Sequence, residues 1–375
     1  MRHAVGGVLL LLLAVPLAAA EDKPEQKPKS PREQYQALLK ESQDAMTAFA
    51  QAYQKAETDE ARQKVLAEKY PRPDKVAAAM TELAEKNPRD PVALDALVWV
   101  LTNQGRGPGG AGKTDVQKTA ARLVRENFLD SDKLGPVCRQ LASATDPDVR
   151  ALLQAIREKS PHKAVQAEAT LAQAMSLNEQ IAMVEALKRE PEVAKQVEAV
   201  YGKAFVENLQ KADPADLEKQ AAGLLQEVAD KYASGMKPAE LARTVQMLGM
   251  RGSASAEPFL RTLMDKDARD EVKGLACLTL GQVYKEQADA KPDQAEALQK
   301  KAEALFEQAA AKFADVKTPF GDTVGAKAKS ELFDLRHLAV GKTAPEVEGQ
   351  DQDGQKFKLS DYRGKVVLLD FWSQF

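Results

Sequence analysis

One long stretch of helix-forming residues dominates this chain. From Tyr35 to about Phe313 the sequence is rich in Ala, Leu, Glu, Lys and Gln, which have high helix propensity. Apolar residues recur there at spacings of three and four, as at Val76, Met80 and Leu83, while strand-like alternation is nearly absent. Such a chain can bury its apolar faces only by packing helix on helix. The sequence therefore predicts a mostly α protein with a helical domain over about residues 34–335.

Prolines divide this stretch at the intervals expected of helical hairpins. Proline is tolerated in the first turn of a helix but not in its interior, so each such pair predicts a helix boundary. The pairs are Asn87-Pro88, Asp90-Pro91, Asp146-Pro147 and Asp213-Pro214. We therefore expect many antiparallel helices joined by short connections.

The stretch also matches itself faintly at an offset of 107 residues, which carries Leu153 onto Leu260. The matched pairs are Leu153/Leu260, Lys159/Lys266, Val165/Val272, Ala169/Ala276, Leu171/Leu278, Glu179/Glu286 and Gln180/Gln287. Both segments are rich in Ala and Leu, so part of the match reflects composition. The alignment predicts a repeat-like helical domain.

A second pattern resembles the tetratricopeptide repeat over about residues 274–315. Leu280-Gly281-Gln282-Val283-Tyr284 matches the L-G-x2-Y of its first helix, and Ala302, Phe306 and Ala309 have the spacing of its second. In that motif the glycine admits the partner helix and the aromatic residues fill the gap. Because the connection is long and Cys277 stands where the motif has Trp, we predict a tetratricopeptide-like pair and not a regular array.

A helical array of this kind can offer a groove for peptides or partner proteins, or act as a scaffold for a neighbouring domain. Aromatic residues make up only 5% of the chain, and 53 Lys plus Arg nearly balance 56 Asp plus Glu. No surface is therefore singled out, and both roles stay open. The net charge of −3 gives no basis for nucleic-acid binding.

The first residues are typical of a secretory signal. Met1-Arg2-His3 is a basic start, Val8 to Leu17 is apolar, and Ala18-Ala19-Ala20 supplies the small residues of a cleavage site. The apolar run is shorter than the roughly 18 residues of a membrane span. We expect a signal peptide at residues 1–20, a Lys-Pro linker at residues 21–33, and a periplasmic or secreted protein without a stable membrane anchor.

The chain has few residues of the kinds that bind metals or attack substrates. Its two cysteines, Cys138 and Cys277, and its three histidines form no metal-ligand spacing and no C-x-x-C. Cys138 shares an apolar helix face with Leu134 and Leu141, and Cys277 lies within the apolar stretch Leu275 to Leu280. We expect both thiols to be buried, with a distant disulfide between them as the alternative, and we expect neither metal nor cofactor.

Gly107 to Thr114, GPGGAGKT, satisfies the phosphate-loop pattern G-x-x-x-x-G-K-[ST]. In a true phosphate loop a strand runs directly into the first glycine, whereas here Thr102 to Arg106 separate Leu97–Leu101 from it. The flanking sequence is also helical. We interpret this segment as a glycine-rich connection between helices. A nucleotide-dependent enzyme is kept as a third hypothesis, which requires ATP binding that Lys113→Ala abolishes.

The composition changes at Val340. The new segment opens with Val340-Gly341-Lys342-Thr343-Ala344-Pro345 and reaches a hairpin-turn signal at Asp353-Gly354. Phe357 and Leu359 then alternate as in a half-buried strand. Leu359-Ser360-Asp361-Tyr362-Arg363-Gly364-Lys365 leads into Val366 to Phe371, a continuous apolar run typical of a central strand.

These features, in this order, resemble the start of a TlpA/ResA-type thiol-disulfide oxidoreductase, in the AhpC/TSA group of thioredoxin-like redoxins. That family has G-K-x-A-P, D-G and L-S-D-x-x-G-K, and then a strand ending in F-W-x-x-[WF]-C-x-x-C. Phe371-Trp372-Ser373-Gln374-Phe375 fits this oxidoreductase branch better than the peroxidase branch. The resemblance implies an N-terminal fragment of a thioredoxin-like domain at residues 338–375, with a β-hairpin and one strand, and a protein thiol or disulfide as partner.

By the same resemblance, the first redox residue would follow Phe375 directly, with Trp372 and Phe375 packed beside it. Residues 1–375 hold no catalytic cysteine. Because UGA encodes both stop and selenocysteine, one hypothesis is a selenoprotein whose UGA was read as stop. A nonsense mutation, a sequencing error and a deliberately shortened chain are the alternatives. We therefore predict an oxidoreductase-like protein that is inactive as residues 1–375, the alternative being a helical binding or scaffold protein with a vestigial redoxin tail.

Overall fold

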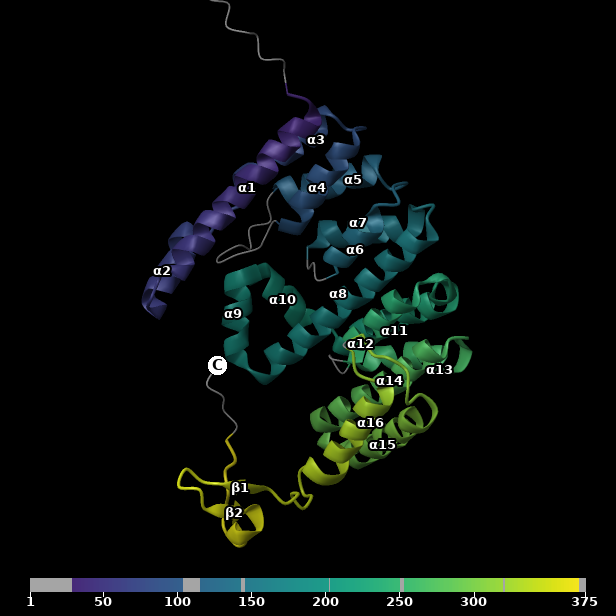
Figure 1. The fold of residues 1–375 in the computed structure, drawn as a ribbon. Coiled ribbons are helices and arrows are strands. Elements are labelled where there is room, and N and C mark those ends of the chain that lie inside the picture. Colours follow the sequence, from purple (N-terminus) through teal and green to yellow (C-terminus); the bar gives the residue numbers. More distant parts are fainter. Residues whose placement is uncertain are drawn as a thin grey trace, which may run out of the picture.

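The computed structural model describes residues 29–103, 115–142, 146–201, 203–249, 253–319 and 321–370. These residues form a curved stack of helices that ends in a small β-hairpin (Figure 1). The mostly α architecture predicted from the sequence is confirmed. The predicted signal peptide at residues 1–20 lies outside the described residues, as does the linker up to residue 28.

Most of the connections between consecutive helices are short. The first half of the stack contains α1 (Pro31–Gln54), α2 (Asp59–Lys69), α3 (Asp74–Lys86), α4 (Pro91–Asn103), α5 (Asp115–Asn127), α6 (Leu134–Gln140), α7 (Pro147–Lys159) and α8 (Lys163–Arg189). The second half contains α9 (Pro191–Tyr201), α10 (Lys203–Lys211), α11 (Pro214–Lys231), α12 (Pro238–Gly249), α13 (Glu257–Lys266), α14 (Asp270–Ala290), α15 (Ala295–Lys312) and α16 (Val324–Phe333). A π-helical turn, η4 (Asp334–Leu338), continues α16.

Side-chain caps explain where several helices begin. Asp146 accepts a hydrogen bond from the backbone N–H of Asp148 at 2.8 Å at the start of α7, and Asp213 caps α11 in the same way. Both are Asp-Pro pairs, so these predicted boundaries are confirmed. Ser30 and Glu33 form a reciprocal capping box that starts α1 at Pro31, inside the predicted linker of residues 21–33.

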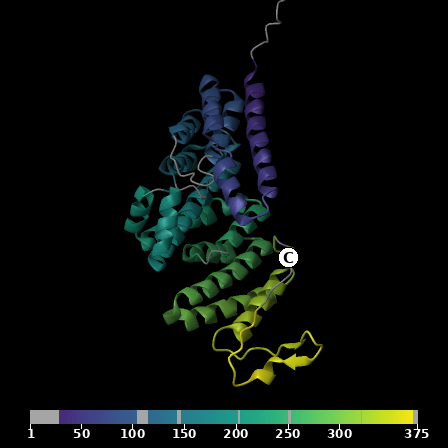
Figure 2. The same cartoon turned by 90° about the vertical axis from the view of Figure 1, so that its left-hand side faces the viewer.

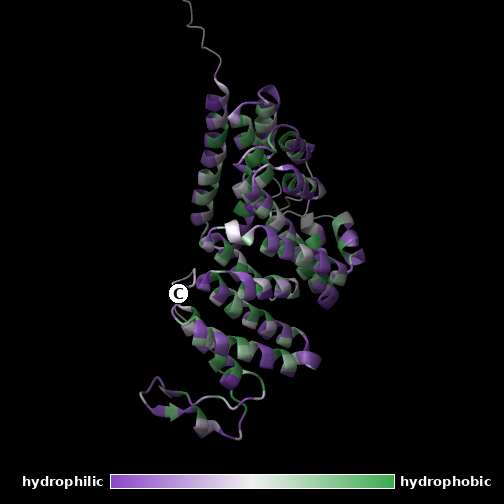
Figure 3. Cartoon of the chain, turned by 90° about the vertical axis from the view of Figure 1, so that its right-hand side faces the viewer, coloured by the Kyte–Doolittle hydropathy of each residue, from purple (hydrophilic) through white to green (hydrophobic). Residues whose placement is uncertain are grey.

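Two hydrophobic cores fill the stack, and α8 belongs to both. Its Val165 and Ala169 pack with α3 to α7, whereas its Leu171 and Met175 pack with α11 to α16. A helix buried on two faces is expected where two layers meet. In Figure 3, which colours the ribbon by hydropathy, hydrophobic and hydrophilic residues accordingly alternate along the helices of the stack.

The faint sequence repeat corresponds to a repeat of helices in the structure. Helices α7 and α13 end at Lys159 and Lys266, and α8 and α14 begin at Lys163 and Asp270, each pair at the offset of 107 residues. The aligned apolar pairs are buried in both copies: Leu153/Leu260, Val165/Val272, Ala169/Ala276 and Leu171/Leu278. Composition alone would not place every pair in the core.

The correspondence extends to two further helices. Helix α6 packs on α8 as α12 packs on α14, and α11 packs on α8 as α15 packs on α14. Helices α11 and α15 have 18 residues each and end at aromatic C-caps, Tyr232 and Phe313. We call α6, α7, α8 and α11 the first unit and α12 to α15 the second unit. Helices α9 and α10 are inserted in the first unit only.

The close packing predicted by the tetratricopeptide-like pattern lies between α14 and α15. The ring of Phe306 sits against Gly281, and the Cys277 Sγ donates a hydrogen bond to the Leu305 carbonyl at 3.3 Å. The glycine thus admits the partner helix, as the pattern indicates. Membership of that repeat family stays a prediction.

Candidate functional site in the C-terminal segment

The segment after η4 folds as a β-hairpin at the end of the stack, below the last helices in Figures 1 and 2. Strands β1 (Glu348–Gln350) and β2 (Lys356–Lys358) are antiparallel, with Gly349 opposite Phe357. In the turn, the Asp351 carboxylate accepts backbone hydrogen bonds from Asp353 at 3.0 Å and Gln355 at 2.8 Å. Gly354 adopts a φ of 76°, which favours glycine. The predicted Asp353-Gly354 turn is confirmed.

Two contacts hold the strands of the hairpin together, and a third ties the hairpin to the residues that come after it. The half-buried ring of Phe357 covers Gly349 across the strand pair, where a Cβ would lie 2.8 Å from the ring. The Lys358 ammonium pairs with Glu348 on the facing strand. The Glu346 carboxylate accepts the backbone N–H of Ser360 at 2.9 Å, and its hydrogen bonds with Ser360 hold the pKa of Glu346 below its usual value.

The predicted central strand is not formed in the described part of this segment. Residues 366–370 have no strand pairing, and Val366 and Leu368 are 103% and 91% exposed. A central strand obtains its hydrogen bonds and its cover from strands and helices on both sides. The described residues place no such neighbour beside it, so an apolar run that reads as a strand stays exposed. Phe371 to Phe375 lie outside the described residues.

Comparison with known proteins gives matches in this segment. The AhpC/TSA family profile matches residues 340–375. Thiol-disulfide oxidoreductase ResA of Geobacillus thermodenitrificans is 51% identical over 35 residues, which cover 9% of this chain and 20% of that protein. ResA of Geobacillus kaustophilus is 54% identical over 35 residues, with the same coverage. No solved structure matches the chain.

Residues 340–375 are a fragment of a TlpA/ResA-type redoxin. The chain spans about a fifth of the length of the curated relatives that it matches. Within the redoxin segment the structure confirms the hairpin on which the resemblance depends. The redox position directly after Phe375 stays a prediction.

The two cysteines lie in the helical stack, far along the chain from the redoxin segment. Cys138 is buried on α6, where desolvation and then the charge of Glu168 raise the pKa of its thiol to about 12. Cys277 is buried on α14, where desolvation likewise raises the pKa of its thiol to about 12. Both cysteines are free, so the alternative of a disulfide between them is wrong. Neither thiol has the lowered pKa and the access that thiol exchange needs.

The remaining sequence predictions concern metals, membranes and nucleotides. Within the described ranges, no group of three or more His, Cys, Asp and Glu side chains is arranged to hold a metal ion. No helix in the same ranges is long and apolar enough to cross a membrane. The phosphate-loop pattern, Gly107 to Thr114, lies outside them. Its neighbours are helices, α4 up to Asn103 and α5 from Asp115, as the sequence predicts, and Leu97 to Leu101 belong to α4 instead of a strand.

One polar cluster was not anticipated from the sequence. Arg157 of α7, Glu227 and Lys231 of α11, and Tyr232 at the end of α11 line a cleft in the first unit. The signal that could have revealed it is the internal repeat, because the aligned positions of the second unit carry different chemistry.

Proposed function

We propose that the protein is an extracytoplasmic thiol-disulfide oxidoreductase-like protein, built from a helical domain and a redoxin segment. The 35-residue identity to two ResA proteins carries this proposal. The redox residue would follow Phe375, as cysteine or selenocysteine, and would act on a thiol or disulfide of a partner protein. Export would follow from the signal-like residues 1–20.

On this proposal, residues 1–375 do not catalyse thiol exchange by themselves. Exchange requires a thiolate that can attack a disulfide sulfur and a second thiol that resolves the mixed disulfide. Burial keeps Cys138 and Cys277 protonated and out of reach of a protein substrate. The helical domain would then position the redoxin segment or its partner.

A second candidate is a helical binding or scaffold protein whose redoxin segment is vestigial. Its support is that the two hydrophobic cores and the duplicated units belong to the helical stack. The two candidates predict different codons after that of Phe375.

The deciding experiment is to read the nucleotide sequence of the codon after Phe375 and about 300 bases beyond it, enough for the remainder of a small domain. We expect UGA or a cysteine codon, then an in-frame thioredoxin-like continuation with a cysteine three codons later. Any other stop codon, or a frame without that continuation, would contradict the oxidoreductase proposal. The helical binding or scaffold protein would then be the remaining candidate.

Activity provides an independent check. The protein extended through that frame, with cysteine after Phe375, should accelerate the reduction of insulin by dithiothreitol. The matched serine variant and residues 1–375 should not. Export is tested separately, because mass spectrometry of the protein from the producing cell should show a mature chain that begins near Glu21.

A further inference from the structure

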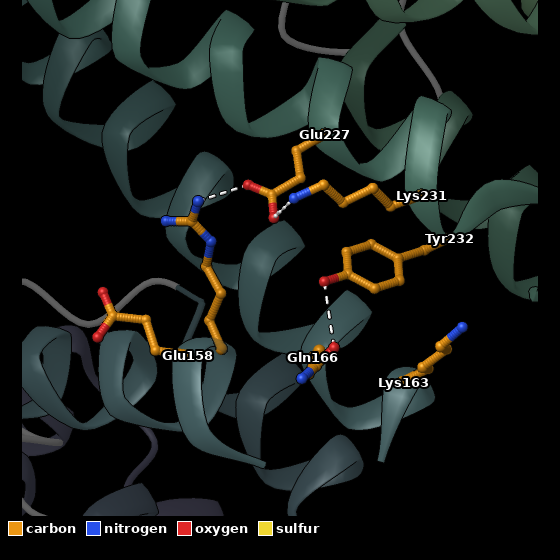
Figure 4. Close-up of a pocket in the computed structure, with 7 residues that line it drawn as sticks. Glu158, Lys163, Gln166, Glu227, Lys231 and Tyr232 are labelled. Carbon is orange, nitrogen blue, oxygen red and sulfur yellow. Dashed lines mark hydrogen bonds and ion pairs between the residues drawn. The ribbon is translucent and has the colours of Figure 1, made fainter. Parts of the chain in front are cut away.

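A cleft of about 550 Å³ opens in the first unit, where the end of α7 and the start of α8 face the end of α11. It is lined by Arg157, Glu158, Lys163, Gln166, Glu227, Lys231 and Tyr232 (Figure 4). All but Tyr232 carry a charge or an amide. Small-molecule sites are mostly lined by apolar side chains, so this lining does not suit an apolar ligand.

The lining of the cleft carries one more cation than anion, because Arg157, Lys163 and Lys231 face Glu158 and Glu227. The single carboxylate of Glu227 pairs with both Arg157 and Lys231, the latter at 3.2 Å. These hydrogen bonds outweigh desolvation and lower the pKa of Glu227, so its carboxylate stays ionised at neutral pH. Lys163 is exposed and has no ion-pair partner among the described residues. The Glu158 carboxylate points away from Lys163 and Tyr232 in Figure 4.

Tyr232 lies between the two lysine side chains and separates Lys163 from Lys231 in Figure 4. Its hydroxyl donates a hydrogen bond to Gln166 Oε1 at 3.3 Å, and Gln166 in turn donates to the Ser160 carbonyl at 2.8 Å. The ring is therefore held in place by α8. The ring is half-buried because it also packs against the core of α11 to α16, and the part that lines the cleft lies between the two lysines.

The second unit keeps one residue of this cleft, since Lys231 corresponds to Lys312, but it has other residues at four positions. When α7 and α8 are aligned with α13 and α14 at the offset of 107 residues, Arg157 corresponds to Met264 and Lys163 to Asp270. Between the matched helices α11 and α15, Glu227 corresponds to Gln308 and Tyr232 to Phe313. Phe313 packs closely on α14, with its Cβ 2.8 Å from where a Cβ on Gly274 would lie.

An ion pair that is partly removed from water gains little over a well-packed apolar pair. Arg157 and Glu227, whose side chains are 29% and 17% exposed, form such a pair where the second unit has Met264 and Gln308. Folding alone therefore does not account for the Arg157–Glu227 pair of the first unit.

We propose that this cleft binds an acidic peptide segment of a partner protein. The segment would place carboxylates on Lys163 and Lys231 and its backbone on the Tyr232 ring, with no rearrangement of the Glu227 pairs. The inference does not depend on redox activity, and it would hold for either candidate function.

The test uses a fluorescein-labelled peptide of six glutamates, whose binding to the protein is followed by fluorescence anisotropy at low salt. We expect saturable binding that weakens as salt is added, because exposed charge pairs are screened. Peptides of six glutamines and six lysines should not bind. Equal binding by free glutamate, at the same concentration of residues, would overturn the assignment to a peptide.

The sharpest variant is Lys163→Asp, which introduces the residue that the second unit has at the same helix position. Lys163 is the first residue of α8, where an acidic side chain is favourable, so folding should be preserved. We expect the affinity for the hexaglutamate peptide to fall about tenfold or more, and Lys163→Gln to lower it about threefold. Tyr232→Phe should weaken binding less than Lys163→Asp.

Lys203→Asp is the matched control. It makes the same change at the first residue of α10, outside the cleft, and it should leave the affinity within twofold of wild type. An unchanged affinity in Lys163→Asp, or an equal loss in Lys203→Asp, would overturn the proposal. Thermal midpoints of each variant show that a loss of binding is not a loss of fold.

Discussion

Gly281 of α14 lies so close to Phe306 of α15 that a Cβ at Gly281 would stand 2.5 Å from the ring Cε1 atom. Both residues are buried, and Phe306 is fully buried. Interhelical distance depends on the side chains at the contact, so glycine here sets how closely these two helices approach.

Gly281→Ala should therefore destabilise the protein, although alanine favours helix. Overpacking a full core costs about 1 to 3 kcal/mol, whereas the gain in helix propensity is about 1 kcal/mol. We expect a lower thermal midpoint by circular dichroism. Gly223→Ala is the control, since Gly223 lies inside α11 with nothing within 4 Å of a Cβ, and it should raise the midpoint. A stabilised Gly281→Ala would show that the contact is not tight.

The thiols of Cys138 and Cys277 should be inert in the folded protein. Burial raises the pKa of each to about 12, so at pH 8 almost none of either is thiolate. Titration with Ellman's reagent should give no fast reaction until a denaturant is added, when both thiols react. Rapid labelling of the native protein would contradict the burial of at least one of them.

Asp267 should make stability depend on acid pH. Its carboxylate, 4% exposed, pairs with Arg269 at 2.7 Å, and Arg269 also donates to the carbonyls of Ala233 and Met236. Hydrogen bonds from Arg269 lower the pKa of Asp267 below its ordinary 3.8. Its stabilisation is thus fully present above about pH 4 and is lost as pH falls through the folded-state pKa.

Asp267→Asn should accordingly cost about 2 kcal/mol of unfolding free energy at pH 7. The difference from wild type, measured by urea unfolding, should shrink as the pH is lowered below 4. Asp230→Asn removes an exposed carboxylate 3.6 Å from Lys266 and should change stability by less than about 0.5 kcal/mol. A difference for Asp267→Asn that does not vary with pH would rule out this linkage.

ATP should not bind to the phosphate-loop pattern. A phosphate loop is approached by a strand, whereas Gly107 to Thr114 follow helix α4. Magnesium-ATP at millimolar concentration should leave the thermal midpoint unchanged, in wild type and in Lys113→Ala alike. A midpoint increase that Lys113→Ala removes would restore the nucleotide hypothesis.

The sequence predicted correctly those features that depend only on residues close together in the chain. Asp146-Pro147 and Asp213-Pro214 begin helices because a capping carboxylate and a first-turn proline act within one turn. The hairpin at Asp353-Gly354 likewise depends on adjacent residues. The central strand expected at Val366 is different, because a strand exists only with neighbours that the residues themselves do not specify.

The acidic-peptide cleft shows the same limit at longer range. Its Arg157–Glu227 pair joins residues 70 positions apart, with α9 and α10 inserted between α8 and α11. The offset that aligns α7 and α8 with α13 and α14 therefore misaligns α11 with α15. Only the packed helices show that Tyr232 corresponds to Phe313.

The number of helical units also sets a distance in this molecule. The redoxin segment and α1 lie at opposite ends of the stack in Figure 1, so the number of stacked units sets the span between them. Neighbouring helix layers are about 10 Å apart, so one unit of two layers contributes roughly 20 Å. A chain with one unit more or fewer would hold its redoxin segment at a different distance from α1. The residues of α1 and of the redoxin segment would not have to change.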